Sequence, residues 1–204
     1  MKNKIVFIGY SGHSYGCIEL AINQGLKVEG YFDLKEKKIN PYNLKFLGID
    51  SHIKKNHHPF ISIGHNLTRR KIYEKLNNDK IFLELSLIHS NSIISNSSFI
   101  KNQTYVSAGV IINPMVNIGK GCIINTGAIL EHESKIGDFT HICPGAVLAG
   151  NVTIGENCMI GANSTIKEGV KIGNNVTVGA GSVIISDIIN DKIIVGNPGR
   201  VLKK

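Results

Sequence analysis

Hydrophobic and polar positions follow two different periods along the chain. In the first part, the short apolar runs KIVFI (4–8), VEGYF (28–32) and PFISI (59–63) predict strands, whereas residues 14–24 and 66–77 have the spacing of helices. Gly25 is expected to close the first helix, and Asn66 or Thr68 to cap the second. Strand, helix, strand, then strand and helix predict a small parallel α/β domain over residues 1–86, with a loop-rich connection at 34–58.

From residue 88 onward an aliphatic residue recurs at every sixth position. Seventeen positions from Ile88 to Ile184 keep this register, and a small or modest side chain follows each aliphatic residue by four positions, as at Thr140, Ala146 and Cys158. Gly or Asn stands three positions after the aliphatic residue in 11 of 16 hexads. Because Gly and Asn tolerate positive φ, each hexad is expected to end in a corner.

Three hexads make one triangular turn of 18 residues, so residues 87–204 are expected to form a parallel β-helix with an aliphatic core. Cys122 and Cys158 are 36 residues apart, which is two full turns. They are therefore expected to face the same way, too far apart for a disulfide, as part of the core.

One hexad breaks the rule of the others. Residues 130–135 read LEHESK, and Glu133 occupies a corner position where most hexads carry Gly or Asn. A repeat that abandons its local pattern at one place is expected to do so for function. His132 beside Glu133 suits a proton acceptor with a carboxylate that orients it and raises its basicity.

Two further polar residues lie near this hexad. Asn125 occupies a position where several hexads have Gly, and His141 follows His132 by nine residues, which is one and a half hexads. His132 and His141 are therefore expected at different corners of one chain, and a site that uses both would cross a subunit boundary. A triangular prism with a divided site predicts a closed threefold ring, a homotrimer.

Composition narrows the class of protein. The 204 residues are 42% hydrophobic and 6% aromatic, and the formal charge of +8 lies mostly in residues 1–86, with 14 Lys and Arg against 8 Asp and Glu. No basic cluster is interleaved with aromatic residues, so we expect no nucleic-acid partner, and the excess charge suits phosphorylated small molecules. No apolar segment reaches membrane-spanning length, so we expect a cytoplasmic protein without membrane insertion. The four cysteines lack CxxC spacing, and no metal site is expected.

The run GHSYG at 12–16 matches the G-x-S-x-G pattern that presents a nucleophilic serine in α/β-hydrolases. That interpretation requires a long sheet before the motif and an acid and a histidine after it. Here the motif follows the first predicted strand, so we expect the match at Ser14 to be accidental. One register earlier, Gly9 to His13 form a glycine-rich turn before a helix, where a diphosphate can bind.

The hexads resemble those of the hexapeptide-repeat transferases, whose β-helix is left-handed. The segment INTGAILEHESKIGDFTHICPGAVLAGNVTIGENCMIGANSTI, the G-x-S-G-H turn and VGNPGR near the C-terminus are similar to the sugar acyltransferases of surface-glycan synthesis. The closest resemblance is to N-acetyltransferases of 4-amino-4,6-dideoxy nucleotide sugars, such as that of bacillosamine synthesis. It implies a Rossmann-like N-terminal domain that binds the nucleotide sugar and a left-handed β-helix that binds acetyl-CoA as co-substrate.

The resemblance also implies roles for individual residues. His132 matches the general base and Glu133 the residue that tunes it, Asn125 matches a polar neighbour of that site, and His141 a contact with acetyl-CoA near its thioester. The acetyl-CoA pantetheine arm would pass the backbone at Gly161, Ala162, Gly179 and Ala180, where absent side chains would leave room for it. The nucleotide sugar would contact Ser11, Gly12, His13, Asp33 and Gly64. Leu34 and His65 depart from the family pattern beside Asp33 and Gly64, where the nucleotide would sit.

Direct transfer to the C4 amine, with His132 as the base and without a metal, is the function this pattern favours. O-acetylation of a sialic acid or a related sugar is the alternative on the same fold. Two further alternatives are a hydrolyase of the carbonic anhydrase type, which needs three histidine ligands at a metal, and a non-catalytic nucleotide-sugar binder. His132 and His141 supply only two of the three ligands that the hydrolyase needs. A non-catalytic binder would not require the charged corner at 132–133.

Overall fold

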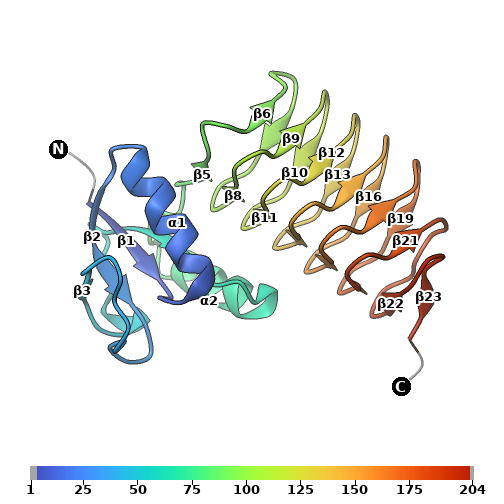
Figure 1. Ribbon diagram of the computed structural model, residues 1–204. Coiled ribbons are helices and arrows are strands. Elements are labelled where there is room, and N and C mark those ends of the chain that lie inside the picture. The colour runs from blue at the N-terminus through green and yellow to red at the C-terminus, as the bar shows by residue number, and fades with distance from the viewer. Residues whose placement is uncertain (1–3, 203–204) are drawn as a thin grey trace. The chain divides into compact units, whose positions relative to one another are not determined.

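A computed structural model describes residues 4–202 of the chain. The chain divides into two compact units, Met1–Leu87 and Ile88–Lys204. The first unit is an α/β domain and the second is a β-solenoid of the left-handed type (Figure 1).

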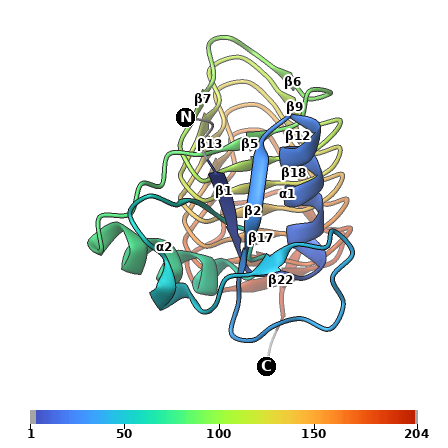
Figure 2. The same cartoon turned by 90° about the vertical axis from the view of Figure 1, so that its left-hand side faces the viewer.

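The N-terminal unit is a parallel sheet with two helices. Its elements are β1 (Lys4–Ile8), α1 (Gly12–Asn23), β2 (Lys27–Phe32), β3 (Lys45–Phe46), a 3-10 helix (Asp50–His52), β4 (His58–Ile61) and α2 (Asn66–Asn78). The strand order is β3-β2-β1-β4, with all neighbours parallel. Helix α1 packs against β2 and α2 against β4, and the two helices flank the strands in Figure 2. The chain moves outward from β1 to β3 and then returns to the other side of β1, so the order reverses between β1 and β4.

The three predicted strands and two helices all form, with ends shifted by up to two residues. Gly25 lies just beyond α1 with φ of 72°, as expected of a residue that closes a helix. The expected cap of α2 is wrong, because His65 occupies that position and its Nδ1 accepts the Thr68 N–H at 3.3 Å. Strand β3 was not predicted, because an isolated strand of two residues shows no hydrophobic period.

The solenoid begins with seventeen two-residue strands. They are β5 (Leu87–Ile88), β6 (Ile93–Ile94), β7 (Phe99–Ile100), β8 (Tyr105–Val106), β9 (Ile111–Ile112), β10 (Asn117–Ile118), β11 (Ile123–Ile124), β12 (Ile129–Leu130), β13 (Lys135–Ile136), β14 (His141–Ile142), β15 (Val147–Leu148), β16 (Thr153–Ile154), β17 (Met159–Ile160), β18 (Thr165–Ile166), β19 (Lys171–Ile172), β20 (Thr177–Val178) and β21 (Val183–Ile184). A hairpin of β22 (Ile193–Val195) and β23 (Arg200–Val201) follows, antiparallel and closed by the VGNPGR segment.

From β6 to β18, each strand pairs in parallel with the strand one turn later. Ile123 pairs with His141 and Ile129 with Val147, so the turn is 18 residues, as predicted. Every third strand therefore joins the same sheet, and the solenoid has three faces, which are sheets of eight, six and five strands.

The repeat's three kinds of position behave as the sequence predicts. The aliphatic residues from Val106 to Ile184 form one buried core, which also holds the residues four positions later, including Cys122 and Cys158. Fourteen successive corners, from Gln103 to Gly181, have positive φ. The corner rule holds even where the residue is neither Gly nor Asn, as at Glu133 with φ of 62° and Phe139 with φ of 58°.

Candidate functional site

His132 lies at the corner between β12 and β13. Its Nδ1 is 3.2 Å from Glu133 Oε2, and the two side chains are 53% and 54% exposed. The left-handed backbone at Glu133 is required by the corner, although a glutamate gains nothing from it. The pair is therefore a polar, solvent-accessible group on a rigid turn of the solenoid.

This arrangement suits general-base chemistry. A carboxylate beside Nδ1 favours the tautomer that carries its proton there, because that N–H can donate to Oε2. The lone pair then resides on Nε2, which can accept a proton.

Gly150, which the sequence reasoning missed, makes room for the His132 ring. A Cβ at Gly150, one turn after His132, would lie 2.6 Å from the ring's Cε1 and 2.7 Å from Nε2. The imidazole therefore rests on the Gly150 backbone. The available signal was the 18-residue spacing, which places positions 132 and 150 at the same corner of successive turns.

Asn125 lies close to His141 and is remote in the fold from His132. Asn125 Nδ2 is 3.2 Å from His141 Nε2, and the two residues lie on neighbouring turns of the eight-stranded sheet. Asn125 stands at the corner between β11 and β12, whereas His132 stands at the next corner. The two corners border opposite ends of the strands of the six-stranded sheet, so Asn125 and His132 do not meet within one chain, and His141 lies in β14 and not at a corner as expected.

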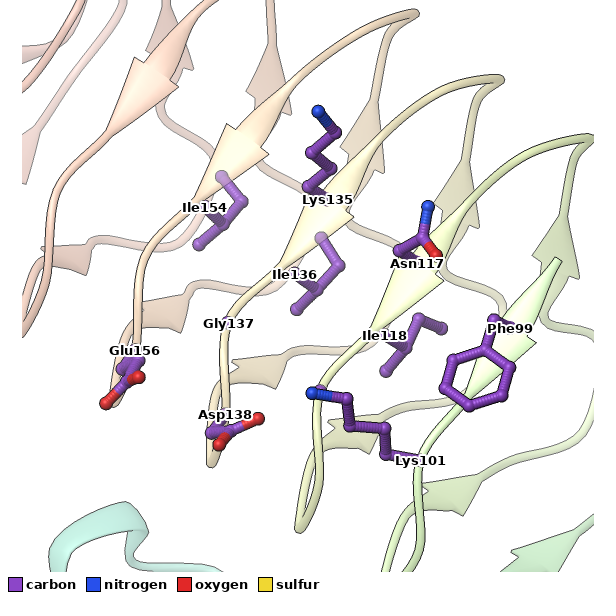
Figure 3. Close-up of a pocket in the computed structure, with 11 residues that line it drawn as sticks. Phe99, Lys101, Asn117, Ile118, Lys135, Ile136, Gly137, Asp138, Ile154 and Glu156 are labelled. Atoms are coloured by element: carbon purple, nitrogen blue, oxygen red, sulfur yellow. The ribbon is translucent and has the colours of Figure 1, made fainter.

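The outer face of the six-stranded sheet is apolar between these two corners. Its outward row is Ile93, Ile111, Ile129, Val147, Thr165 and Val183. The outward row of the five-stranded sheet is Phe99, Asn117, Lys135, Thr153 and Lys171. An open groove of about 410 Å³ crosses this second face, where Lys101, Asp138 and Glu156 line one side (Figure 3). The outer face of the five-stranded sheet is thus mostly polar, whereas that of the six-stranded sheet is mostly apolar.

The glycines expected to flank the pantetheine arm have a packing role. A Cβ at Gly161 would lie 2.5 Å from both Ala180 N and Val178 O, in the backbone of the next turn. A Cβ at Gly179 would meet Val195 Cγ1 at 2.9 Å. The space of the absent side chain at these two positions is therefore filled by the following turn, contrary to the expectation that it would be left for a ligand. Ala162 is half-buried and Ala180 is exposed at the same corner.

In the N-terminal unit, Ser11, Gly12 and His13 form the start of α1. Ser11 is the N-cap, and a Cβ at Gly12 would meet no atom within 4 Å. A Cβ at Gly64 would lie 3.7 Å from His13 Cβ, so the loops after β1 and β4 lie side by side. This is the place where the strand order reverses, which is the usual ligand crevice of open parallel sheets.

Asp33 links the loops that follow β1 and β2 beside this crevice. Its Oδ2 accepts the Tyr10 N–H at 2.9 Å and is 3.1 Å from Lys37 Nζ, while its Oδ1 accepts the Leu34 N–H at 2.7 Å. Both oxygens thus already have protein partners. Leu34 itself is 90% exposed.

Arg69, a second residue that the sequence reasoning missed, holds the loop after β4. It is only 2% exposed, and its Nη1 donates to the carbonyls of Ile63 and Gly64, each at 2.9 Å. Its position within the predicted helix 66–77 gave no sign that the side chain turns back toward the strand end.

Ser14 is not placed as a nucleophile. It is fully buried, its Oγ donates to Ser11 O at 2.7 Å, and it accepts the Ser11 N–H at 2.7 Å. The hydroxyl therefore stabilises the turn before α1. The cysteines are also buried and unpaired with each other, and burial raises the pKa of both Cys143 and Cys158 to about 11.

Within residues 4–202, no group of three or more His, Cys, Asp or Glu side chains is arranged to hold a metal ion. No helix of that described part is long and apolar enough to cross a bilayer.

Three family models match parts of the chain. Residues 4–76 match the PglD N-terminal domain, residues 133–168 the bacterial transferase hexapeptide (six repeats), and residues 151–186 the hexapeptide repeat of succinyl-transferase. Together they match parts of both units.

Solved structures match nearly the whole chain. The acetyltransferase domain of PglB from Neisseria gonorrhoeae, in complex with acetyl coenzyme A, is 30% identical over 99% of this chain and 100% of its own, with a TM-score of 0.89. PerB from Caulobacter crescentus, in complex with CoA and GDP-perosamine, is 30% identical over 98% and 97%, with a TM-score of 0.91. WeeI from Acinetobacter baumannii is 22% identical with a TM-score of 0.84, a likeness of fold.

Proposed function

The chain belongs to the hexapeptide-repeat sugar N-acetyltransferases, and on this premise we propose that it acetylates the C4 amine of a nucleotide-linked 4-amino-4,6-dideoxy sugar in the cytoplasm. Acetyl-CoA is the donor, and a UDP-linked sugar of bacterial glycan synthesis is the acceptor. The observation that carries this proposal is the His132–Glu133 pair, a histidine beside a carboxylate at a corner of the solenoid.

The reaction is a direct transfer. The amine nitrogen attacks the thioester carbonyl carbon, and His132 Nε2 takes a proton that the nitrogen must lose. The carbon–sulfur bond then breaks, and coenzyme A leaves as the thiolate. Glu133 stabilises the imidazolium through Nδ1. Positioning two substrates and supplying one base suffices, because a thioester is already activated and an amine is a good nucleophile.

We propose that the site is completed by a neighbouring copy in a homotrimer. The apolar row on the six-stranded sheet needs a cover, and three such faces directed at a threefold axis would cover one another. In that ring, the His132 corner of one copy lies beside the Asn125 corner of the next, because these corners border opposite edges of the face. The amine and the thioester would meet at this boundary.

The crevice between β1 and β4 is proposed to hold the nucleotide sugar. The N-terminus of α1 and the open surface at Gly12 suit a diphosphate, because a helix N-terminus favours an anion. His13 lies beside Gly64 and would reach toward the sugar. A nucleotide-sugar ligand is also supported by the similar PerB, which has been solved with GDP-perosamine.

The test is thiol release from acetyl-CoA with UDP-, GDP- and dTDP-linked 4-amino-4,6-dideoxy sugars and with sialic acid. We expect turnover with an amino sugar, UDP-linked first, and a product whose acetyl group resists mild alkali, as an amide does. An alkali-labile product, or turnover with sialic acid alone, would show O-acetylation. No thiol release with any acceptor would favour a non-catalytic binder.

A further inference from the structure

Four side-chain hydrogen bonds run across three successive turns of the solenoid and end on His141. Tyr105 OH donates to Ser107 Oγ at 3.3 Å, Ser107 Oγ is 2.9 Å from Thr126 Oγ1, Thr126 Oγ1 donates to Asn125 Oδ1 at 3.4 Å, and Asn125 Nδ2 is 3.2 Å from His141 Nε2. The chain begins at two buried residues, since Tyr105 is 7% and Ser107 6% exposed.

The direction of the middle hydrogen bond follows from the other two, in which the hydroxyls of Tyr105 and Thr126 are the donors. Ser107 accepts from Tyr105, and Thr126 gives its proton to Asn125, so the proton between Ser107 and Thr126 belongs to Ser107. Each hydroxyl then accepts one hydrogen bond and donates one.

The same reasoning fixes the orientation of the Asn125 amide. Asn125 Oδ1 accepts the Thr126 N–H at 2.8 Å, and a backbone N–H can only donate. A flipped amide would place its NH₂ against that N–H. Asn125 Nδ2 therefore faces His141 and donates, and His141 Nε2 must be the acceptor.

We infer that Asn125, Thr126, Ser107 and Tyr105 are positioning residues that hold His141 in the neutral tautomer with its proton on Nδ1. This inference rests on the proposed acetyl transfer for its chemical purpose. With its Nε2 lone pair occupied by an amide donor, His141 cannot serve as a second base. It serves as a hydrogen-bond donor that polarises the thioester carbonyl oxygen.

The two histidines thus share a tautomer and differ in role. At His132 a carboxylate accepts from Nδ1–H, and the lone pair is on Nε2. At His141 a neutral amide donates to Nε2. One ring accepts the proton of the amine, and the other stabilises the charge on the acyl oxygen.

The test reads the tautomer by nitrogen-15 NMR of the whole protein, with the His141 signal assigned by its absence in His141→Gln. We expect the proton on Nδ1 in the wild type. In Asn125→Asp the new carboxylate accepts from Nε2, so the proton moves there, and turnover falls by about 10- to 100-fold.

Variants of Thr126 separate positioning from folding. Thr126→Val removes the hydroxyl that holds both Ser107 and Asn125, so mixed tautomers and a smaller loss of turnover are expected, and Thr126→Ser should restore both. Thr153→Val, at an outward position of the five-stranded sheet, is the matched control and should change neither.

A wild-type proton on Nε2, or an unchanged tautomer in Asn125→Asp, would overturn the inference. So would equal behaviour of Thr126→Val and Thr153→Val. His132→Ala should lower turnover by about 10²- to 10⁴-fold and leave the His141 tautomer unchanged, so failure of the proposed function is distinguishable from failure of this assignment.

Discussion

At the scale of single residues, the groups that contact each histidine ring determine its possible role in proton transfer. His132 is half exposed at a corner with a carboxylate on Nδ1, and its ring rests on the backbone of Gly150. The charge pattern of LEHESK was sufficient to predict the His132–Glu133 pair, because the two residues are adjacent in sequence. The glycine beneath was not predictable from its own hexad, since its importance comes from a contact between turns.

Gly150→Ala is expected to lower kcat/KM by about 10- to 100-fold, because a methyl group would displace the His132 ring and a small misplacement of a base is costly. The melting temperature should change little, since the ring is the exposed end of a side chain that can move. Steady-state kinetics and thermal unfolding of the same preparation test this.

Gly161→Ala is the matched contrast. Its methyl group would meet the backbone of the next turn, so a clear fall in melting temperature is expected. Equal effects of the two substitutions on stability would contradict the distinct roles of these glycines.

Ser14→Ala is expected to keep most of the acetyl transfer and to destabilise the N-terminal unit by about 1 kcal/mol, because the Ser11 N–H loses its acceptor. Denaturant unfolding and turnover measure the two effects. Complete loss of turnover in a folded variant would revive the nucleophilic interpretation of GHSYG.

At the scale of elements, the solenoid was predictable almost strand by strand, and the α/β unit less completely. One local rule governs each hexad, so the aliphatic register gave the core, and the corner residues gave the turns. That rule held at Phe139 and Met115, where side-chain preference opposes the positive φ, because the turns above and below impose it. The cap at His65 and the inward turn of Arg69 depend on individual side-chain hydrogen bonds, which no sequence period reveals.

Ile129→Lys is expected to prevent assembly, because it places a charge in the middle of the apolar row on the six-stranded sheet. Sedimentation should show trimers for the wild type and monomers for the variant. Thr153→Lys, on the polar five-stranded face, is the control and should remain trimeric. Monomers of the wild type would refute the proposed ring.

At the scale of the whole molecule, the proposed active site is divided between neighbouring copies of the chain. His132→Ala and His141→Ala subunits, each of low activity, should therefore complement one another when coexpressed. In a ring of randomly mixed subunits, about a quarter of the boundaries would have both histidines intact. Activity no greater than the sum of the separate variants would show that each site lies within one chain.

The central claim is that His132 is the base for acetyl transfer to an amine. The most direct measurement is the rate of thiol release from acetyl-CoA with a nucleotide-linked 4-amino-4,6-dideoxy sugar by wild-type and His132→Ala protein. A fall of about 10²- to 10⁴-fold in kcat, in a variant that still folds and assembles, is the expected result. Turnover by His132→Ala within about twofold of the wild type would contradict the claim.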